Sequence, residues 1–260
     1  MHPDWRGIPM NDNQADIVKI AKDLNLSVFA RYTDYVKTGR PFEENLLELL
    51  REQAMETDTA RVNRRIRYAG FPVLKTLNTF DASAERFPNL NLNEWAELAS
   101  CRFIDEKADV VAIGPPGYGK THAAIAIGHE AIKQGYSVRF KRAVDLVNEM
   151  REAKSEKVLV KYTKTLNNCR LLIIDEVGYL PHDTAASNFL FQIISARYET
   201  GSTFYTSNYE FSKWPQFIEN AGLAEAIVNR IAHHSIVLNM NGPIAWRLEH
   251  ARSRTDAMRG

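Results

Sequence analysis

The sequence is poor in the features that mark secreted, membrane-spanning or strongly charged proteins. Two cysteines, Cys101 and Cys169, are too few for the disulfide framework of a small secreted scaffold. No apolar run approaches the ~20 residues that a membrane-spanning helix needs, and residues 1–16 hold no apolar core of signal-peptide length. The formal net charge of +1 excludes a chain that is basic overall, although a local basic surface can still bind nucleic acid. These absences predict a cytoplasmic protein with no membrane partner.

Hydrophobic patterning divides the chain into a helical first part and a larger part in which strands and helices alternate. Apolar residues at helical spacing, and a long pattern that follows Pro41 and ends at Gly70, predict a helical N-terminal domain over residues 1–70. Residues 71–91 contain two prolines and several turn formers, which predicts a linker. The remaining chain is expected to form one domain over 92–250 and a C-terminal tail over 251–260.

Five short segments in the second part predict strands, with helices between them. They lie near residues 110–113, 137–140, 170–175, 202–208 and 235–240. Two of them are continuous apolar runs, as expected for strands that are covered on both faces. The alternation of strands and helices predicts an α/β fold, with a parallel sheet flanked by helices.

The segment from Gly114 to Thr121 satisfies the phosphate-loop pattern G-x-x-x-x-G-K-[ST], between an expected strand and an expected helix. Glycines let several backbone N–H groups point at phosphate oxygens, which a Cβ would obstruct. Lys120 supplies a positive charge for the outer phosphates, the Thr121 hydroxyl can bind Mg²⁺, and the following helix adds the positive end of its dipole. The expected nucleotide-binding residues are Gly114, Pro115, Pro116, Gly117, Tyr118, Gly119, Lys120, Thr121 and His122.

Polar residues at the ends of two expected strands indicate that the nucleotide is hydrolysed. Asp175 and Glu176 follow an apolar run at the carboxyl end of a strand, where ligands bind in α/β folds. We expect Asp175 to hold Mg²⁺ through its water shell and Glu176 to polarise the attacking water. Asn208, which ends the next strand, is expected to hold that water or the γ-phosphate, although asparagine also ends strands as a turn former. No N-K-x-D motif is present, which disfavours a GTPase.

Arg230 lies on an expected helix whose apolar face consists of Ala224, Ile227 and Ile231. The functional interpretation is an arginine that reaches the γ-phosphate of a neighbouring subunit, which accelerates hydrolysis ~10³–10⁵-fold where it occurs. The alternative is an ordinary solvent-exposed arginine. His233 and His234 follow, and no other histidine or cysteine stands at zinc-ligand spacing, so we interpret them as structural.

A basic segment between the second and third expected strands is a candidate DNA-binding surface. Its lysines recur every three or four residues across the second of two expected helices, 143–153 and 156–167, and two arginines extend them. The residues are Arg142, Arg151, Lys154, Lys157, Lys161 and Lys164. Such a stripe suits the phosphate backbone without base specificity, and a solvated helix face is the alternative.

Several of these segments together resemble one known family. "FIDEKADVVAIGPPGYGKTHAAIAIG", "LLIIDEVGYLP", "FYTSN" and "NRIAHHSIVLNMNG" resemble the IstB-like transposition helper ATPases, relatives of the DnaC-type helicase loaders in the AAA+ class, over about residues 60–250. The resemblance implies an AAA+ core, and the few residues after that core lead us to expect no C-terminal lid domain. It assigns Gly114–Thr121 to the Walker A motif, Asp175 and Glu176 to Walker B, Asn208 to sensor 1 and Arg230 to the arginine finger.

The resemblance departs from the family pattern near the C-terminus. Arg247 stands near a C-terminal arginine of the family, but Ile244, Ala245 and Trp246 replace the middle of its usual "GxSYR" pattern. A phosphate-binding role for Arg247 is therefore not carried over.

The family's activity would be ATP- and Mg²⁺-dependent homo-oligomerisation on double-stranded DNA, selection or remodelling of target DNA, and recruitment of the transposase of the same mobile element. The helical N-terminal domain would then face a partner or DNA. Three alternatives remain from the residues: a loader whose partner is a replicative helicase, a monomeric phosphate-loop kinase, and a non-enzymatic DNA-bending protein that uses ATP only for assembly.

Overall fold

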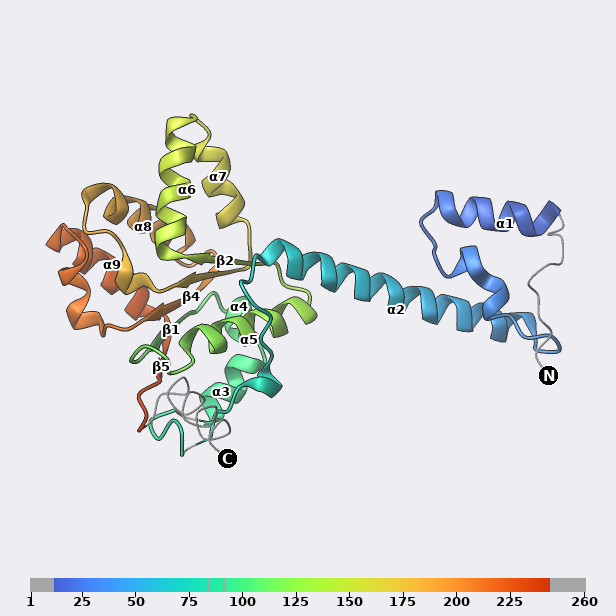
Figure 1. Cartoon of the computed structure of the whole chain (residues 1–260), viewed down its shortest axis with the longest axis horizontal. Coiled ribbons are helices and arrows are strands. Elements are labelled where there is room, and N and C mark those ends of the chain that lie inside the picture. Colours follow the sequence, from blue (N-terminus) through green and yellow to red (C-terminus); the bar gives the residue numbers. More distant parts are fainter. Residues whose placement is uncertain (1–11, 84, 91, 244–260) are drawn as a thin grey trace, which may run out of the picture. The chain divides into compact units, whose positions relative to one another are not determined.

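The computed structural model describes residues 12–83, 85–90 and 92–243, and the chain divides into two compact units, Met1–Arg64 and Arg65–Gly260 (Figure 1). The division falls inside the long helix α2 (Phe42–Ala69). In the part of the chain that is described, no helix has the length and apolar character to cross a membrane.

The N-terminal unit is helical, as its sequence predicts. It contains α1 (Asp12–Asp23), the short 3-10 helix η1 (Phe29–Asp34) and the first part of α2. Buried polar side chains of α2 fix the loops that precede it: Val28 N donates to Gln53 Oε1 at 3.0 Å, and Lys37 N donates to Asn45 Oδ1 at 3.0 Å. This unit therefore depends on side-chain-to-backbone hydrogen bonds as well as on apolar burial.

The second unit contains a five-stranded sheet in which every neighbouring pair is parallel, with the order β2-β3-β4-β1-β5. The strands are β1 (Asp109–Ile113), β2 (Val138–Arg142), β3 (Leu171–Asp175), β4 (Ser202–Ser207) and β5 (Ser235–Asn239). All five coincide with predicted segments, and the predicted parallel α/β fold is confirmed. Strand β4 lies between β3 and β1, so the ends of β3 and β4 are neighbours.

Helices cover both faces of this sheet, as Figure 1 shows. Alternate strand residues face opposite sides, so Val111, Leu172 and Tyr205 pack in a core beneath one helical layer. That layer consists of α6 (Ala143–Ser155), α7 (Leu159–Asn167), α8 (Thr184–Arg197) and α9 (Ala221–His233). The other face carries α3 (Leu92–Ala99), α4 (Arg102–Asp105) and α5 (Lys120–Lys133). Short 3-10 helices complete the unit: η2 (Leu77–Thr79), η3 (Val177–Tyr179) and η4 (Phe211–Gln216).

The turn between α6 and α7 differs from the predicted pair of helices. Lys157 adopts a left-handed conformation with φ of 60°. Its amide donates to Lys154 O at 3.2 Å, and the Val158 amide donates to Ala153 O at 2.8 Å. These are the two bonds of a Schellman motif, which ends a helix. The basic residues expected on one helix are therefore divided between the end of α6, this turn and α7.

The described part of residues 71–91, expected to be a linker, belongs to the second unit and packs against α3 and α5. The Phe80 ring lies 4.5 Å from the Trp95 ring, 5.7 Å from Phe87 and 5.3 Å from His122, measured between centroids. The Thr79 hydroxyl lies 3.0 Å from His122 Nε2. This segment is thus part of the packed structure beside the phosphate loop. At the other end of the chain, Ile244, Ala245, Trp246, Arg247 and the predicted tail 251–260 lie outside the described residues.

Candidate nucleotide site

The phosphate loop curls between the end of β1 and the start of α5. Gly117 and Gly119 have φ of +89° and +83°, which other residues rarely adopt, and Gly119 caps the N-terminus of α5. Beside the loop, Met240 N donates to Ile113 O at 2.7 Å. A Cβ on Gly114 would come within 2.7 Å of Met240 O. Gly117 and Gly119 are therefore required by their backbone conformation, and Gly114 by the close approach of Met240.

The Lys120 side chain lies within the curl of this loop and is only 7% exposed. Its Nζ donates to Gly114 O at 2.7 Å and to Pro115 O at 2.8 Å. The Lys120 ammonium and the first N–H groups of α5 therefore gather positive groups at one loop. The residues present fit a phosphate chain, which would lie against Lys120 and those N–H groups.

Asp175, at the carboxyl end of β3, connects the phosphate loop to the sheet and is 2% exposed. Its Oδ1 accepts from Thr121 Oγ1 at 2.8 Å and from Thr206 Oγ1 at 2.6 Å. The Thr206 hydroxyl in turn accepts from the Glu176 amide at 2.8 Å. One buried hydroxyl of β4 therefore positions both acidic residues. The sequence prediction missed Thr206, since a threonine within a strand is an ordinary β-former.

The Thr121 hydroxyl and the Asp175 carboxylate fit Mg²⁺. Both offer oxygen donors, the kind that this hard cation takes, and they already lie side by side at the phosphate loop. A carboxylate that is fixed by two hydroxyl donors is also held in one orientation. These are the residues that would hold Mg²⁺ between the loop and β3.

The loop opens into a cavity of about 260 Å³ whose lining comes from several segments. One wall is the phosphate loop and the start of α5, from Pro116 to His122. Glu176, Tyr179 and Asn208 line it from the ends of β3 and β4. The segment expected to be a linker supplies the opposite wall, with Val73, Lys75, Thr79, Phe80, Asp81, Arg86 and Phe87. Sequence reasoning missed this wall, because its turn-rich composition carries no nucleotide motif.

Glu176 lines this cavity from a left-handed backbone conformation, with φ of 60° and ψ of 45°. A non-glycine residue in this region is uncommon and is held there by its surroundings, here by the amide bond to Thr206. This conformation puts the two consecutive acids in different environments. Asp175 is buried, whereas Glu176 is exposed and lines the same cavity as Asn208. The structure thus brings together the predicted Lys120, Glu176 and Asn208.

His122, which follows the phosphate-loop threonine, lies where the linker wall meets α5. Burial, and then the charge of Lys75, lowers the pKa of its imidazole. The ring is therefore neutral near pH 7, and it hydrogen-bonds the Thr79 hydroxyl rather than adding positive charge. His122 is among the residues that line the cavity, and its contact with the nucleotide stays a prediction.

Arg230 is not among the residues that line the cavity of its own chain. It is half-buried on α9, its Nη1 donates to Ala226 O at 3.1 Å, and its guanidinium lies 4.9 Å above the Phe191 ring. As predicted, Ala224, Ile227 and Ile231 form the buried face of this helix. The arginine is thus held at the surface, away from the phosphate loop of the same chain.

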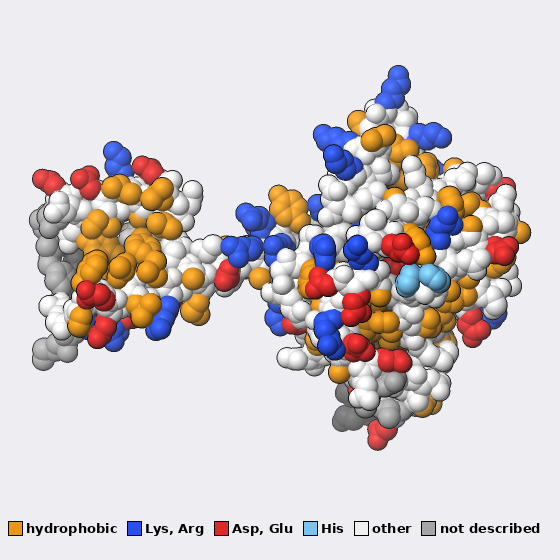
Figure 2. Space-filling model, turned by 180° about the vertical axis from the view of Figure 1, so that it is seen from behind, with side chains coloured by type: hydrophobic (Ala, Val, Ile, Leu, Met, Phe, Trp, Pro, Cys, Tyr) orange, Lys and Arg blue, Asp and Glu red, His pale blue; other side chains and the backbone are white. Residues whose placement is uncertain are grey.

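The predicted basic surface occupies the protruding α6–α7 hairpin. Lys154, Lys157, Lys161 and Lys164 are all exposed there, together with Val160, whose side chain is 83% exposed. Figure 2 shows Lys and Arg side chains gathered around this protrusion, with apolar side chains among them. Arg142 is exposed where β2 joins α6. Arg151 forms an ion pair with Asp183 at the start of α8, so its charge is partly neutralised.

Known proteins resemble this chain over most of its length. The sequence profile of a family described as IstB-like ATP binding protein matches residues 21–254. The ATP-binding protein of insertion sequence IS5376 from Geobacillus stearothermophilus is 38% identical over 234 residues, which cover 88% of this chain and 92% of that relative. The ATP-binding protein of insertion sequence IS21 from Pseudomonas aeruginosa is 37% identical, over 72% of this chain and 70% of the relative.

Solved structures of a helicase loader and of DnaA share this fold. The DnaC helicase loader superposes with a TM-score of 0.52 and 24% identity, over 66% of this chain and 98% of the loader. AMPPCP-bound DnaA from Aquifex aeolicus gives a TM-score of 0.55 and 20% identity, over 72% of this chain and only 56% of DnaA. These likenesses show that this chain shares its α/β fold with DnaC and DnaA.

Proposed function

We propose that this chain, which belongs to the family of IstB-like ATP-binding proteins, is an ATPase that assembles on double-stranded DNA and assists a transposase. The observation that carries the proposal is the convergence of phosphate loop, exposed acid and strand-end amide on one cavity, with a buried carboxylate hydrogen-bonded to the loop. A kinase would need a second pocket for its acceptor, and Glu176 beside the loop favours water as the acceptor.

In the proposed reaction each residue has a separate task. Lys120 and the N-terminus of α5 bind the phosphates, and Thr121 and Asp175 hold Mg²⁺, which neutralises developing charge when bound. Glu176 polarises the attacking water, and Asn208 orients that water or the γ-phosphate from the adjacent strand. Thr206 keeps both acids in place through its two hydrogen bonds.

The linker wall is proposed to hold the adenine base. Val73, Phe80 and Phe87 offer apolar and aromatic surface in the same cavity as the phosphate loop, which suits a flat heterocycle. His122 joins this wall to α5 through Thr79. ATP bound here would contact residues 71–91 and the phosphate loop together.

Assembly is proposed to complete the catalytic site. Arg230 is held on the surface by Phe191 and does not line the cavity of its own chain. In a homo-oligomer it would reach the γ-phosphate bound by a neighbouring copy, and hydrolysis would then depend on contact between copies.

The α6–α7 hairpin is proposed as the DNA-binding surface. Its four exposed lysines suit the phosphate backbone, and exposed Val160 among them could touch the sugars or base edges of a groove. Arg142 and Arg151 would contribute less, since Arg142 lies at the base of the hairpin and Arg151 is paired with Asp183.

The N-terminal unit is proposed to face the partner or DNA. Many of its large apolar side chains are exposed, including those at helical spacing on α1. They are Ile17, Ile20, Leu24, Phe42, Leu47, Leu50 and Met55. Figure 2 shows apolar side chains gathered on the N-terminal unit, and such a patch is typical of an interaction surface. Since the relatives are named for insertion sequences, we propose a transposase as the partner and the cytoplasm as the place of action.

Sizing the full chain with duplex DNA tests the proposal. We expect a large complex only when duplex and either ATP or a non-hydrolysable analogue are both present. A chain that stays monomeric under all conditions while it hydrolyses ATP at full rate would overturn the assembly. Pull-downs with the transposase of the neighbouring gene and with a replicative helicase then distinguish the two partners.

A further inference from the structure

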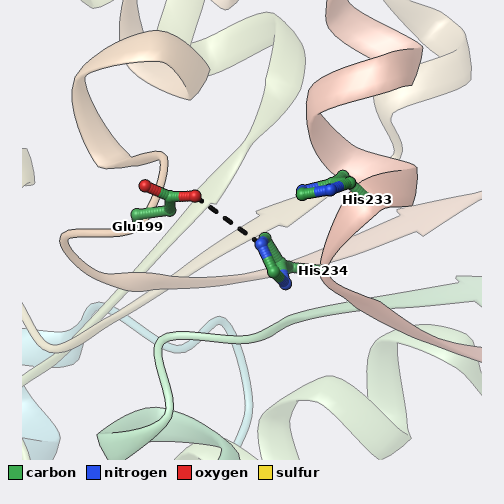
Figure 3. Close-up of side chains that lie close together, drawn as sticks. All are labelled: Glu199, His233 and His234. Carbon is green, nitrogen blue, oxygen red and sulfur yellow. Dashed lines mark ion pairs between the residues drawn. The ribbon is translucent and has the colours of Figure 1, made fainter.

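Two histidines and a glutamate gather at the corner where α8 and α9 end. His233 is the last residue of α9, His234 follows it, and Glu199 lies in the connection from α8 to β4. One potential metal-ligating atom from each residue lies within 4.8 Å of the corresponding atoms of the other two. Figure 3 shows the Glu199 carboxylate directed toward His234, with His233 beside it on α9.

We propose that Glu199, His233 and His234 bind a divalent transition-metal ion, Zn²⁺ or one of similar ligand preference. Two imidazoles and a carboxylate are a ligand set that zinc takes when its fourth position stays open for water. Two ligands at ~2.0–2.1 Å from a tetrahedral zinc lie about 3.4 Å apart. His234 Nε2 and Glu199 Oε1 are already 3.6 Å apart.

The remaining adjustment is small, and the surroundings favour it. All three side chains are exposed, so rotation can bring the third ligand atom from within 4.8 Å to the required spacing. The Tyr198 hydroxyl lies 2.9 Å from His233 Nδ1, which orients the ring and leaves Nε2 for the metal. A hydrogen bond of this kind from the second ring nitrogen is usual for metal-binding histidines.

This site is separate from the proposed ATPase chemistry and does not rest on it. None of its three ligands lines the nucleotide cavity. A bound ion would join the end of α8 to the end of α9, one helical turn after Arg230. The sequence prediction treated the two histidines as structural, because no other histidine or cysteine stands at zinc-ligand spacing. It missed Glu199, which is distant in sequence and supplies the third ligand.

Metal titration of the full chain, stripped with a chelator and kept free of nucleotide, tests this site. We expect saturable binding of one Co²⁺ with the visible absorption of a low-coordinate nitrogen–oxygen site, and displacement of that Co²⁺ by Zn²⁺. Glu199→Gln and His234→Ala should each weaken Zn²⁺ binding at least tenfold. His182→Ala removes an exposed histidine before α8, far from the cluster in the fold, and should leave the affinity unchanged.

The double variant His233→Ala/His234→Ala identifies metal that is bound elsewhere on the chain. If the wild-type chain takes up no more Zn²⁺ than this double variant, the cluster is only a histidine–glutamate ion pair and the proposal is wrong. Thermal unfolding of the metal-free variants checks their folding, and Zn²⁺ should raise the Tm of the wild-type chain but not that of Glu199→Gln. Since Glu199→Gln changes one exposed turn residue, it keeps the test valid even if the double variant unfolds.

Discussion

The Thr206 hydroxyl donates to Asp175 Oδ1 at 2.6 Å, and this bond joins the centre of the sheet to the expected Mg²⁺ ligand. The same hydroxyl accepts from the Glu176 amide, so one side chain on β4 orients two acidic residues that follow β3.

Replacing Thr206 with valine should slow catalysis while it preserves the shape of the side chain. Valine leaves the Asp175 carboxylate short of a donor and the Glu176 amide without an acceptor, and each loss costs ~1–3 kcal/mol. We expect kcat to fall about tenfold or more, which corresponds to ~1.4 kcal/mol, with the KM for ATP changed much less. Thr206→Ser keeps the hydroxyl and should recover most of the rate. Equal loss in both variants would show that the methyl packing, rather than the hydrogen bonds, matters.

Lys120→Ala should remove nucleotide binding. The ammonium lies inside the phosphate loop, and a charged hydrogen bond to phosphate contributes ~1.5–3 kcal/mol. We expect the affinity for a fluorescent ATP analogue to fall more than tenfold, and ATP-dependent assembly to disappear. Lys133→Ala is the matched control, because Lys133 is exposed at the far end of the same helix. Normal assembly of the Lys120 variant would contradict the assigned site.

Glu176→Gln should separate ATP binding from hydrolysis. The amide has nearly the shape of the acid but is a poor base, and general bases contribute ~10²–10⁴-fold to rates. We expect ATP binding to remain and turnover to fall at least tenfold, so that the protein stays on DNA in the presence of ATP. Phosphate release and filter binding measure the two effects. Unchanged turnover would exclude Glu176 as the residue that polarises water.

Arg230→Ala should retain ATP binding and lose turnover. Arginine fingers contribute ~10³–10⁵-fold where they act, and this arginine does not line its own cavity. Mixing the variant with Lys120→Ala protein tests action between copies, because each can supply what the other lacks. We expect partial recovery of hydrolysis in the mixture. Full turnover by Arg230→Ala alone, with no gain on mixing, would show that the arginine is not donated to a neighbour.

Neutralising the α6–α7 lysines should reduce the salt dependence of DNA binding. Each phosphate contact contributes about 0.9 to the slope of log K against log salt. Replacing Lys157, Lys161 and Lys164 with glutamine should therefore lower the slope by up to about 3. The control replaces three exposed lysines on other segments, Lys107, Lys133 and Lys213. If both triple variants lose affinity equally, the hairpin is not the DNA-binding surface.

Most of the fold could be predicted because its signals are local. The apolar run before Asp175 identifies β3, and the glycine pattern after residue 113 identifies the end of β1. Both strands lie where the sequence predicts them. The long helix α2, predicted from Pro41 to Gly70, spans Phe42–Ala69. Such patterns depend on residues close in sequence, and strand alternation alone then predicts the parallel sheet.

Features that depend on contacts between distant segments could not be predicted. Thr206 acts only because β4 lies beside β3, and its own neighbours in sequence carry no sign of that role. Lys157 follows α6 in a left-handed conformation that is usually occupied by glycine, so the spacing of the lysines placed it in the second expected helix, 156–167, instead of in the turn before α7.

The packing of Phe80 against Trp95 and His122 has a practical consequence for dissecting the protein. Composition alone would recommend cutting before residue 92 to obtain an isolated ATPase core. Such a fragment would lack the part of the pocket lining that comes from Val73 to Phe87, and it would leave Trp95 and His122 without their contact to Phe80. Weak ATP affinity in that fragment would reflect where the chain was cut, and the smallest faithful ATPase fragment begins no later than residue 71.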